Sequence, residues 1–178
     1  MADALGIEEA ISGVILFDET LREPLPNGKM ITDLLRSKNI HPGIKVDKGV
    51  VKFNEREETF TQGLDKLEER LLEYKNMGAT FAKWRAVYKV GEKMPSTTAI
   101  VANSIGLAEY ALLSQRAGLV PIVEPEILVL EGNHDIDKSK EVTTMVLKDV
   151  FYWLKEFGVL FSGMLLKPNM VLPGKDSQ

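Results

Sequence analysis

A lysine interrupts an apolar run near the C-terminal end of the sequence. The stretch from Phe161 to Met170 reads FSGMLLKPNM, which is typical of a strand, and Lys167 is its one charged residue. A buried ammonium group must find an anionic partner, lose its proton or take part in chemistry, because an unpaired charge is costly to remove from water. A neutral lysine amine attacks carbonyl carbons to form a Schiff base, so Lys167 is a candidate nucleophile.

Three more strand-like runs contain charged residues in pairs, and each pair is separated by one residue. The pairs are Lys45 with Asp47, Lys83 with Arg85, and Glu124 with Glu126. Because side chains alternate between the faces of a strand, the two members of each pair share a face, whereas Trp84 and Pro125 point the other way. Strands covered on both faces are normally apolar throughout, so the pairs indicate a functional site. For any one pair, a structural salt bridge remains the alternative.

The charges of these residues complement one another. With Lys167, the three pairs supply four cations and three anions, a surplus of about one positive charge that could bind an anionic substrate. Desolvation by residues 164–166 and repulsion from a cation such as Lys83 favour the neutral form of the Lys167 amine. A carboxyl group such as Glu124 is suited to protonate a carbinolamine hydroxyl so that it leaves as water.

Helices and strands alternate along the chain in an order that would bring these residues together. Three stretches have helical apolar periodicity, beginning near Thr61, Ile100 and Val142 and ending before Gly78, Gly118 and Gly158. A glycine just past the last apolar turn is a common helix stop. A strand-like run follows each glycine, at residues 80–90, 119–129 and 159–171.

Two earlier runs, at residues 13–17 and 43–46, also read as strands, with a helix from Met30 to Ser37 between them. About five strands with intervening helices predict an α/β fold with a parallel sheet, and the regular connections favour a TIM (β/α)8 barrel. A complete barrel typically needs about 250 residues. We therefore expect a partial TIM barrel, with residues 1–178 forming a single, incomplete domain whose site lies at the carboxyl ends of the strands.

Composition excludes several classes of function. The 178 residues are 44% hydrophobic and 27% charged, which is ordinary for a globular domain, and the formal net charge is −4. No long run of lysine or arginine is present, so we expect neither nucleic acid nor a membrane surface as partner. The first residues, MADALGIEEA, lack the pattern of a signal peptide or a membrane helix, and a cytoplasmic location is the default expectation.

Metal and thiol chemistry also have little support. The sequence has no cysteine, which excludes disulfides and thiolate ligands. The two histidines, His41 and His134, lie in turn-like stretches, and we expect both to be surface loop residues. No metal and no other cofactor is therefore expected.

Six motifs, in order, give the sequence a resemblance to a known family. They are GVILFDETL, GIKVDKGV, TQGLD, FAKWRAV, VPIVEPEI and LLKPNM, and the match that contains them spans residues 13–174. These motifs resemble the strand motifs of class I fructose-bisphosphate aldolase. The resemblance implies reversible cleavage of fructose 1,6-bisphosphate to dihydroxyacetone phosphate and glyceraldehyde 3-phosphate, without a metal, and a protein that is able to form homo-oligomers.

The resemblance also implies a role for each charged residue. Lys167 is similar to the Schiff-base lysine, Glu124 to the general acid/base, and Lys83 to the lysine that assists carbinolamine chemistry. The positions similar to the family's substrate-binding side chains are Arg85, Lys45, Asp47 and Glu126.

The sequence departs from the family pattern at several places. The family's first-strand motif with its acid/base aspartate, and the last strands with a phosphate-binding loop, have no counterpart in these residues. Residues 51–60 replace a glycine-containing loop, and residues 162–164 replace the usual EGT. The alternative expectation is therefore a catalytically weak or inactive aldolase-like domain that binds sugar phosphates or pairs with another chain.

Overall fold

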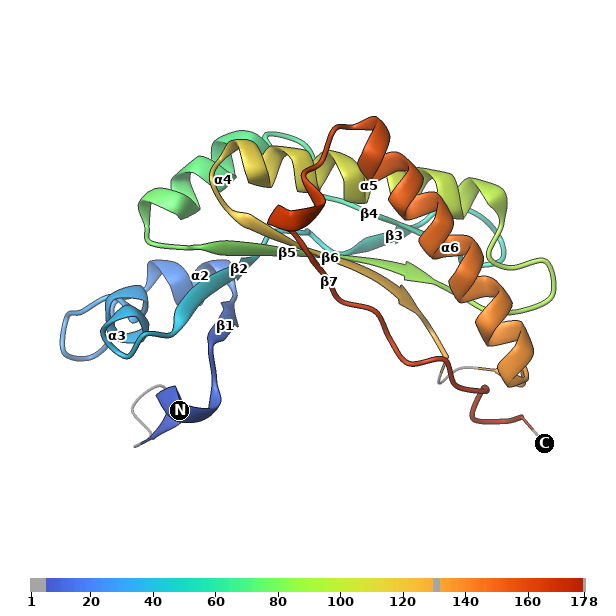
Figure 1. Ribbon diagram of the computed structural model, residues 1–178, viewed down its shortest axis with the longest axis horizontal. Coiled ribbons are helices and arrows are strands. Elements are labelled where there is room, and N and C mark those ends of the chain that lie inside the picture. The colour runs from blue at the N-terminus through green and yellow to red at the C-terminus, as the bar shows by residue number, and fades with distance from the viewer. Residues whose placement is uncertain (1–5, 130–131, 178) are drawn as a thin grey trace.

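The fold is built on a sheet of five parallel strands (Figure 1). The computed structural model describes residues 6–129 and 132–177, so residues 1–5 of the N-terminal stretch and Glu131 lie outside the described residues. The strands, in spatial order, are β1 (Gly13–Leu16), β2 (His41–Lys45), β5 (Phe81–Tyr88), β6 (Val120–Ile127) and β7 (Leu165–Leu166). The prediction of a parallel sheet with alternating helices is confirmed.

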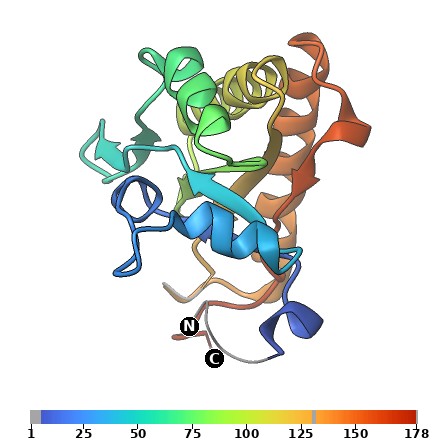
Figure 2. The ribbon, with the colours of Figure 1, turned by 90° about the vertical axis from the view of Figure 1, so that its left-hand side faces the viewer.

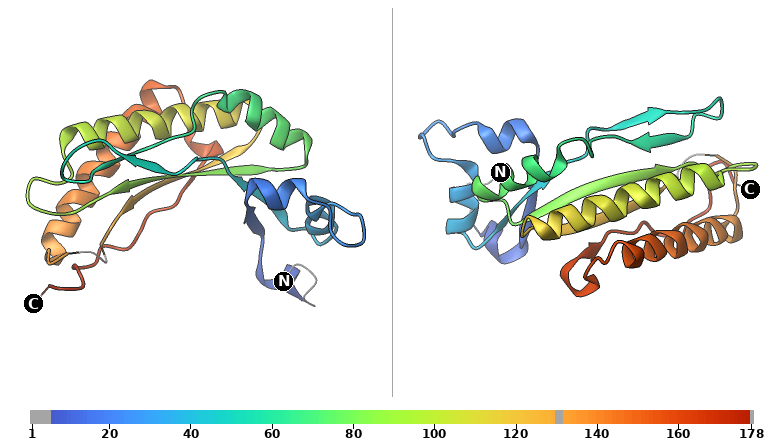
Figure 3. Two further views of the ribbon diagram at one scale, coloured as in Figure 1. Left: turned by 180° about the vertical axis from the view of Figure 1, so that it is seen from behind. Right: turned by 90° about the horizontal axis from the view of Figure 1, so that it is seen from above.

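Helices connect the strands, and the longer ones lie on one side of the sheet (Figures 1 and 3). The elements outside the sheet are α1 (Ile7–Ala10), α2 (Asp18–Arg22), α3 (Ile31–Ser37), α4 (Leu67–Asn76), α5 (Thr97–Arg116), α6 (Ile136–Glu156) and a short 3-10 helix η1 (Phe161–Gly163). In Figure 2, α4 and α5 lie above the strands and α6 to their right, while the short helix α3 lies below β2. No helix in the described ranges is both long and apolar enough to cross a membrane.

The three glycine stops end α4, α5 and α6 as predicted. Gly78, Gly118 and Gly158 have φ values of 99°, 74° and 73°. The residue after each glycine donates its N–H back into the last helical turn, as in Leu119 to the Ser114 carbonyl at 2.9 Å. This Schellman geometry turns the chain into the following strand in all three cases.

The predicted start of the fourth helix at Thr61 is wrong. Thr61 ends a hairpin of two antiparallel strands, β3 (Val50–Lys52) and β4 (Thr59–Thr61), and α4 begins at Leu67. Thr61 is held there by long-range contacts, because its N–H donates to the Asn103 side chain at 3.3 Å and its hydroxyl donates to the Arg85 carbonyl at 2.8 Å. Tertiary hydrogen bonds override the local pattern.

The predicted strand over residues 159–171 is also mostly wrong, because Leu165 and Leu166 alone form its ladder. Before them, the side chain of Gln115 binds Leu160 twice, accepting its N–H at 2.9 Å and donating to its carbonyl at 2.8 Å. This contact holds the chain in the turn that leads to η1. After them, Pro168 has no N–H with which to continue the ladder.

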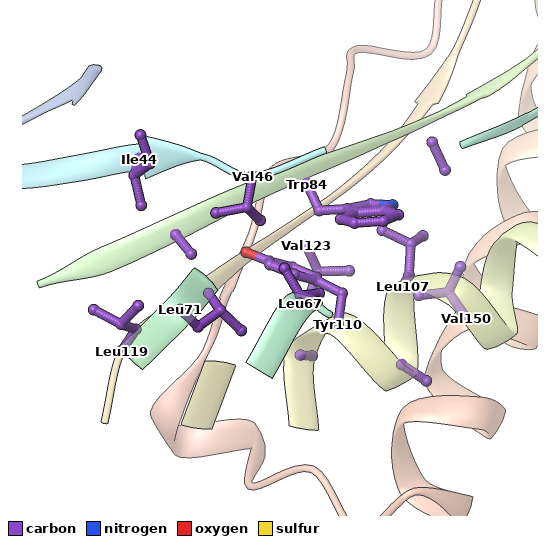
Figure 4. Close-up of a cluster of buried hydrophobic side chains, with 14 of the residues drawn as sticks. Ile44, Val46, Leu67, Leu71, Trp84, Leu107, Tyr110, Leu119, Val123 and Val150 are labelled. Atoms are coloured by element: carbon purple, nitrogen blue, oxygen red, sulfur yellow. The ribbon is translucent and has the colours of Figure 1, made fainter. Parts of the chain in front are cut away.

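The core lies between the sheet and the long helices (Figure 4). Trp84 is 1% exposed and stacks on Tyr110 of α5, with ring centroids 5.5 Å apart. The predicted orientation of Trp84 and Pro125, away from the charged side chains, is confirmed by the alternating burial of β5 and the burial of Pro125. Apolar side chains from α4, α5 and α6 complete the core, among them Leu67, Leu71, Leu107 and Val150.

On the opposite face, the Phe81 ring lies over two glycines. A Cβ added at Gly43 would come within 2.1 Å of this ring, and one at Gly13 within 3.1 Å. The ring therefore occupies space that any other residue at position 43 would need. Together with Ile122 and Leu165, Phe81 forms an apolar layer on this face at the amino-terminal side of the charged residues.

The expectation that both histidines are surface loop residues is wrong. His41 is exposed but begins β2, and His134 is 8% exposed, with neither ring nitrogen hydrogen-bonded within the described part of the chain. The segment near the C-terminus covers His134, because Gly174 donates its N–H to the His134 carbonyl at 2.8 Å. That contact joins residues 40 apart by subtraction and leaves no local signal in the sequence.

Candidate active site

All seven predicted site residues lie on adjacent strands or directly after them. Strand pairing places Lys45 beside Lys83 and Arg85 beside Glu124. The expected position at strand ends is confirmed for Lys45, the last residue of β2, and for Lys167, directly after β7. It is wrong for Lys83, Arg85 and Glu124, because β5 continues to Tyr88 and β6 to Ile127.

Glu124 lies between two lysines at the centre of the site. Its Oε2 is 2.6 Å from the Lys83 Nζ, and its Oε1 accepts a hydrogen bond from the Lys167 Nζ. The side chains of Glu124 and Lys83 are 7% and 12% exposed. A carboxylate with this little solvent is well placed to exchange a proton with either amine.

The expectation that Lys167 is buried is wrong. Its side chain is 56% exposed, and Leu165 before it is 55% exposed. Within the described residues β7 is an edge strand, so no further strand covers this side. The desolvation expected from its apolar neighbours is therefore small here, and the pairing with Glu124 holds the amine in the site.

Two further ion pairs flank this centre. Arg85 pairs with Glu126 through its Nε, and both side chains are partly exposed. Lys45 donates to the Asp47 carboxylate at 2.6 Å, and the second Asp47 oxygen accepts the Arg85 N–H at 3.4 Å. Asp47 is 8% exposed, so the contacts by which it joins β2 to β5 are largely buried.

Tyr110 supports β6 from the helix side of the sheet. Its hydroxyl donates to the Ile122 carbonyl at 3.2 Å, two residues before Glu124. Complete burial raises the pKa of Tyr110 well above its ordinary value, and the charges of Asp47 and Glu124 add to this shift. The phenol therefore stays a neutral donor beneath the site.

The arrangement can form an imine and move protons around it. One accessible amine, a second amine and a shared carboxylate are the groups that carbinolamine formation and dehydration require. No group of three or more histidine, aspartate or glutamate side chains in the described ranges is arranged to hold a metal ion.

One contact beside Lys167 was not singled out from the sequence. The Asn169 Oδ1 accepts the N–H of Ile127 at 2.9 Å. A polar amide directly after a lysine-proline pair at a strand end is a signal that could have drawn attention to it.

A family model described as "Fructose-bisphosphate aldolase class-I" matches residues 1–178. The chain belongs to this family. Fructose-bisphosphate aldolases from several organisms are similar to it along nearly its whole length. The fructose-bisphosphate aldolase of Dictyostelium discoideum is 51% identical over 174 residues, covering 96% of this chain and 48% of that protein. The cytosolic aldolase 5 of Arabidopsis thaliana is 53% identical over 173 residues, covering 97% and 48%.

The solved structures agree with these aldolase relatives. The fructose-bisphosphate aldolase of Plasmodium falciparum, crystallised with TRAP and a small-molecule inhibitor, matches with a TM-score of 0.96 and 47% identity. The match covers 100% of this chain and 52% of that one. The fold is thus a partial TIM barrel, as predicted, and the chain spans about half the length of the curated aldolases it matches.

Proposed function

We propose that this chain carries the Schiff-base site of a class I fructose-bisphosphate aldolase. The reaction is the reversible cleavage of fructose 1,6-bisphosphate to dihydroxyacetone phosphate and glyceraldehyde 3-phosphate. The contact of Lys167 with Glu124, which also meets Lys83, is the observation that carries the proposal, within a chain of the aldolase family.

In the proposed mechanism the Lys167 amine attacks the ketose carbonyl carbon and forms a carbinolamine. Glu124 protonates the hydroxyl, which leaves as water, and the nitrogen becomes an iminium. Lys83 stabilises the negative charge of Glu124 between these proton transfers, at 2.6 Å. The C3–C4 bond then breaks as a base takes the proton of the C4 hydroxyl and C4 becomes the aldehyde carbonyl. The C3–C4 electron pair forms the C2=C3 bond, and the iminium becomes a neutral enamine.

The flanking charges bind the substrate in this proposal. Arg85 and Lys45 are cations on neighbouring strands, and charge-assisted hydrogen bonds make them suited to phosphate oxygens. When no substrate is bound, Asp47 holds Lys45 in place and Glu126 holds Arg85 in place.

We further infer that residues 1–178 form a single, incomplete barrel domain that works on a small sugar phosphate. Several similar aldolases are named cytosolic or cytoplasmic, which supports a cytoplasmic location, although chloroplastic aldolases are also similar. Self-association into homo-oligomers is part of this proposal, and the size of the chain in solution tests it.

Borohydride trapping tests the proposed imine directly. The purified chain is incubated with dihydroxyacetone phosphate, reduced with borohydride and mapped by mass spectrometry. We expect a covalent adduct on Lys167, because reduction fixes an imine as a stable amine. The variant Lys167→Arg should carry no adduct, and exposed Lys155 of α6 is the internal control.

The outcomes separate the two expectations for this chain. No adduct on Lys167, under conditions that label a complete aldolase, would contradict the proposal and favour an inert domain. An adduct together with cleavage of fructose 1,6-bisphosphate would show full chemistry. An adduct without cleavage would show a working imine site that does not complete the reaction.

A further inference from the structure

The ladder between β6 and β7 stops at Lys167. Ile122 pairs with Leu165 and Val123 with Leu166, and the Lys167 N–H then donates to the Val123 carbonyl at 2.9 Å. The next residue on the β7 side, Pro168, has no N–H, and neither does Pro125 on β6. The next hydrogen bond of the ladder, from the N–H of residue 125 to the Lys167 carbonyl, therefore cannot form.

The side chain of Asn169 continues the pairing where the backbone does not. Paired residues on β6 and β7 differ by 43 in number (165 minus 122, 166 minus 123), which places Asn169 opposite Glu126. Its Oδ1 accepts the Ile127 N–H at 2.9 Å, so an amide oxygen takes the part of a carbonyl on a neighbouring strand. The segments then separate around a cavity of about 440 Å³ lined by residues 126–129, Asn169, Met170 and Leu172.

Lys167 consequently lies between two attachments to the same strand. Its own N–H binds Val123, and two residues later Asn169 binds Ile127. The Lys167 side chain is 56% exposed, so close packing does not fix its direction. The backbone position of residues 167–169 must then decide whether the amine meets the Glu124 carboxylate.

We propose that Asn169 is a positioning residue that keeps the Lys167 amine at Glu124 by binding the Ile127 N–H. The contribution of this contact to imine chemistry rests on the proposed function. The contact itself, and its effect on the Lys167 amine, do not depend on that function.

The experiment compares the full chain with three variants. Asn169→Ala removes the acceptor, and Asn169→Asp keeps an acceptor oxygen at the same position. Asn27→Ala is the matched control, because its Oδ1 accepts the Lys29 N–H at 3.0 Å in an exposed turn remote in sequence from the site. Each protein is acylated with a succinimidyl ester, with Lys155 as reference, and is then trapped with dihydroxyacetone phosphate and borohydride.

Loss of the contact should release Lys167 from Glu124. In Asn169→Ala we expect Lys167 to acylate about fivefold faster and to form the imine about fivefold more slowly, the effect of losing one hydrogen bond. Asn169→Asp should restore both rates, and Asn27→Ala should change neither. A role in overall stability alone would not move the Lys167 rate relative to Lys155.

Amide exchange in the unmodified chain provides a test that needs no variant. The Ile127 N–H should be protected from exchange, although the segment after β7 separates from β6 at this point. Exchange of this amide at the rate of an unprotected N–H would overturn the proposal. Equal Lys167 acylation in the full chain and in folded Asn169→Ala would overturn it as well. If the unmodified chain forms no imine, the proposed function fails, while acylation and exchange still decide the positioning role.

Discussion

Glu124 holds two ammonium groups with one carboxylate, and burial makes this contact energetically important. At 7% exposure the carboxylate has little water to replace a lost partner, whereas Lys167 at 56% exposure does. The two lysines are therefore unequal: Lys83 is nearly buried with Glu124 as its counter-charge, and Lys167 can turn to solvent. That asymmetry suits an amine that must receive a substrate.

Neutralising Glu124 should destabilise the fold far more than neutralising Glu126. In Glu124→Gln the nearly buried Lys83 loses its counter-charge, and we expect the free energy of unfolding to fall by about 3 kcal/mol. Glu126→Gln breaks a pair whose side chains are 31% and 42% exposed, with an expected cost under about 1 kcal/mol. Urea unfolding followed by circular dichroism measures both, and equal costs would contradict the assigned role of burial.

For individual residues, the sequence predicted which side chains lie close together in the site but not how exposed each of them is. Period-two spacing is a local property, so the shared face of Lys83 and Arg85 could be predicted from β5 alone. The exposure of Lys167 depends on whether another strand lies beyond β7, which no pattern within FSGMLLKPNM reports. The contact of Asn169 with Ile127 is likewise non-local.

At the scale of elements, the helix ends are set by single glycines. Gly158 has φ of 73°, and a Cβ added there would meet no heavy atom within 4 Å, so Gly158→Ala adds strain without a clash. We expect it to cost about 1 kcal/mol. Gly106 lies inside α5, where an added Cβ meets Leu64 at an ordinary 3.9 Å.

Gly106→Ala is therefore the control, expected to stabilise the chain by about 0.5–1 kcal/mol through helix propensity. Thermal or urea unfolding measures the stability of the two variants, and we expect changes of opposite sign. Shifts of the same sign would show that the left-handed turn after α6 is not what requires glycine.

The hairpin β3–β4 is joined to the start of α5 by a buried carboxylate. Glu58 is 2% exposed and accepts the Ser96 N–H at 2.6 Å and the Asn54 amide at 2.7 Å. Burial opposes its ionisation, but these hydrogen bonds together hold the pKa of Glu58 below its ordinary value of 4.5.

A lowered pKa makes this contribution dependent on pH. The stabilisation is complete above pH 4.5 and is lost as the pH falls through the lower folded pKa, because the unfolded chain binds the proton more readily. Glu58→Gln should cost about 2 kcal/mol at neutral pH and progressively less in acid. Urea unfolding across this range tests it, with exposed Glu55→Gln as control; a pH-independent difference would contradict the ionised contact.

The sequence predicted α3, α5, α6 and the strands β5 and β6 that follow Gly78 and Gly118, since periodicity and stop signals are local. It missed the hairpin because residues 51–60 carry charges rather than a turn motif. Thr61 is held in β4 by Asn103, which is 42 residues away.

For the whole molecule, the face of the sheet opposite the long helices carries exposed apolar side chains. Leu165 is 55% exposed, and Ile15 and Val120 are 40% exposed each. Clusters of this kind on a sheet with open edges promote association. We expect the 19.9 kDa chain to elute as larger species as its concentration rises.

Leu165→Lys should weaken this association about tenfold by placing a charge in the apolar layer. Leu72→Lys is the matched control, because Leu72 is 48% exposed on α4 and lies on the helix side. Size-exclusion chromatography over a concentration series measures the effect. A monomer at all concentrations, or equal effects of the two variants, would rule out this face as the contact.

The Phe81 ring fills the space above Gly43, so the residue types that are tolerated at positions 43 and 81 depend on each other. A larger residue at 43 is compatible with this sheet only where the side chain at 81 moves aside or is smaller. Substitutions at positions 43 and 81 are therefore expected to be coupled in evolution. A change at one position alters which residues are tolerated at the other.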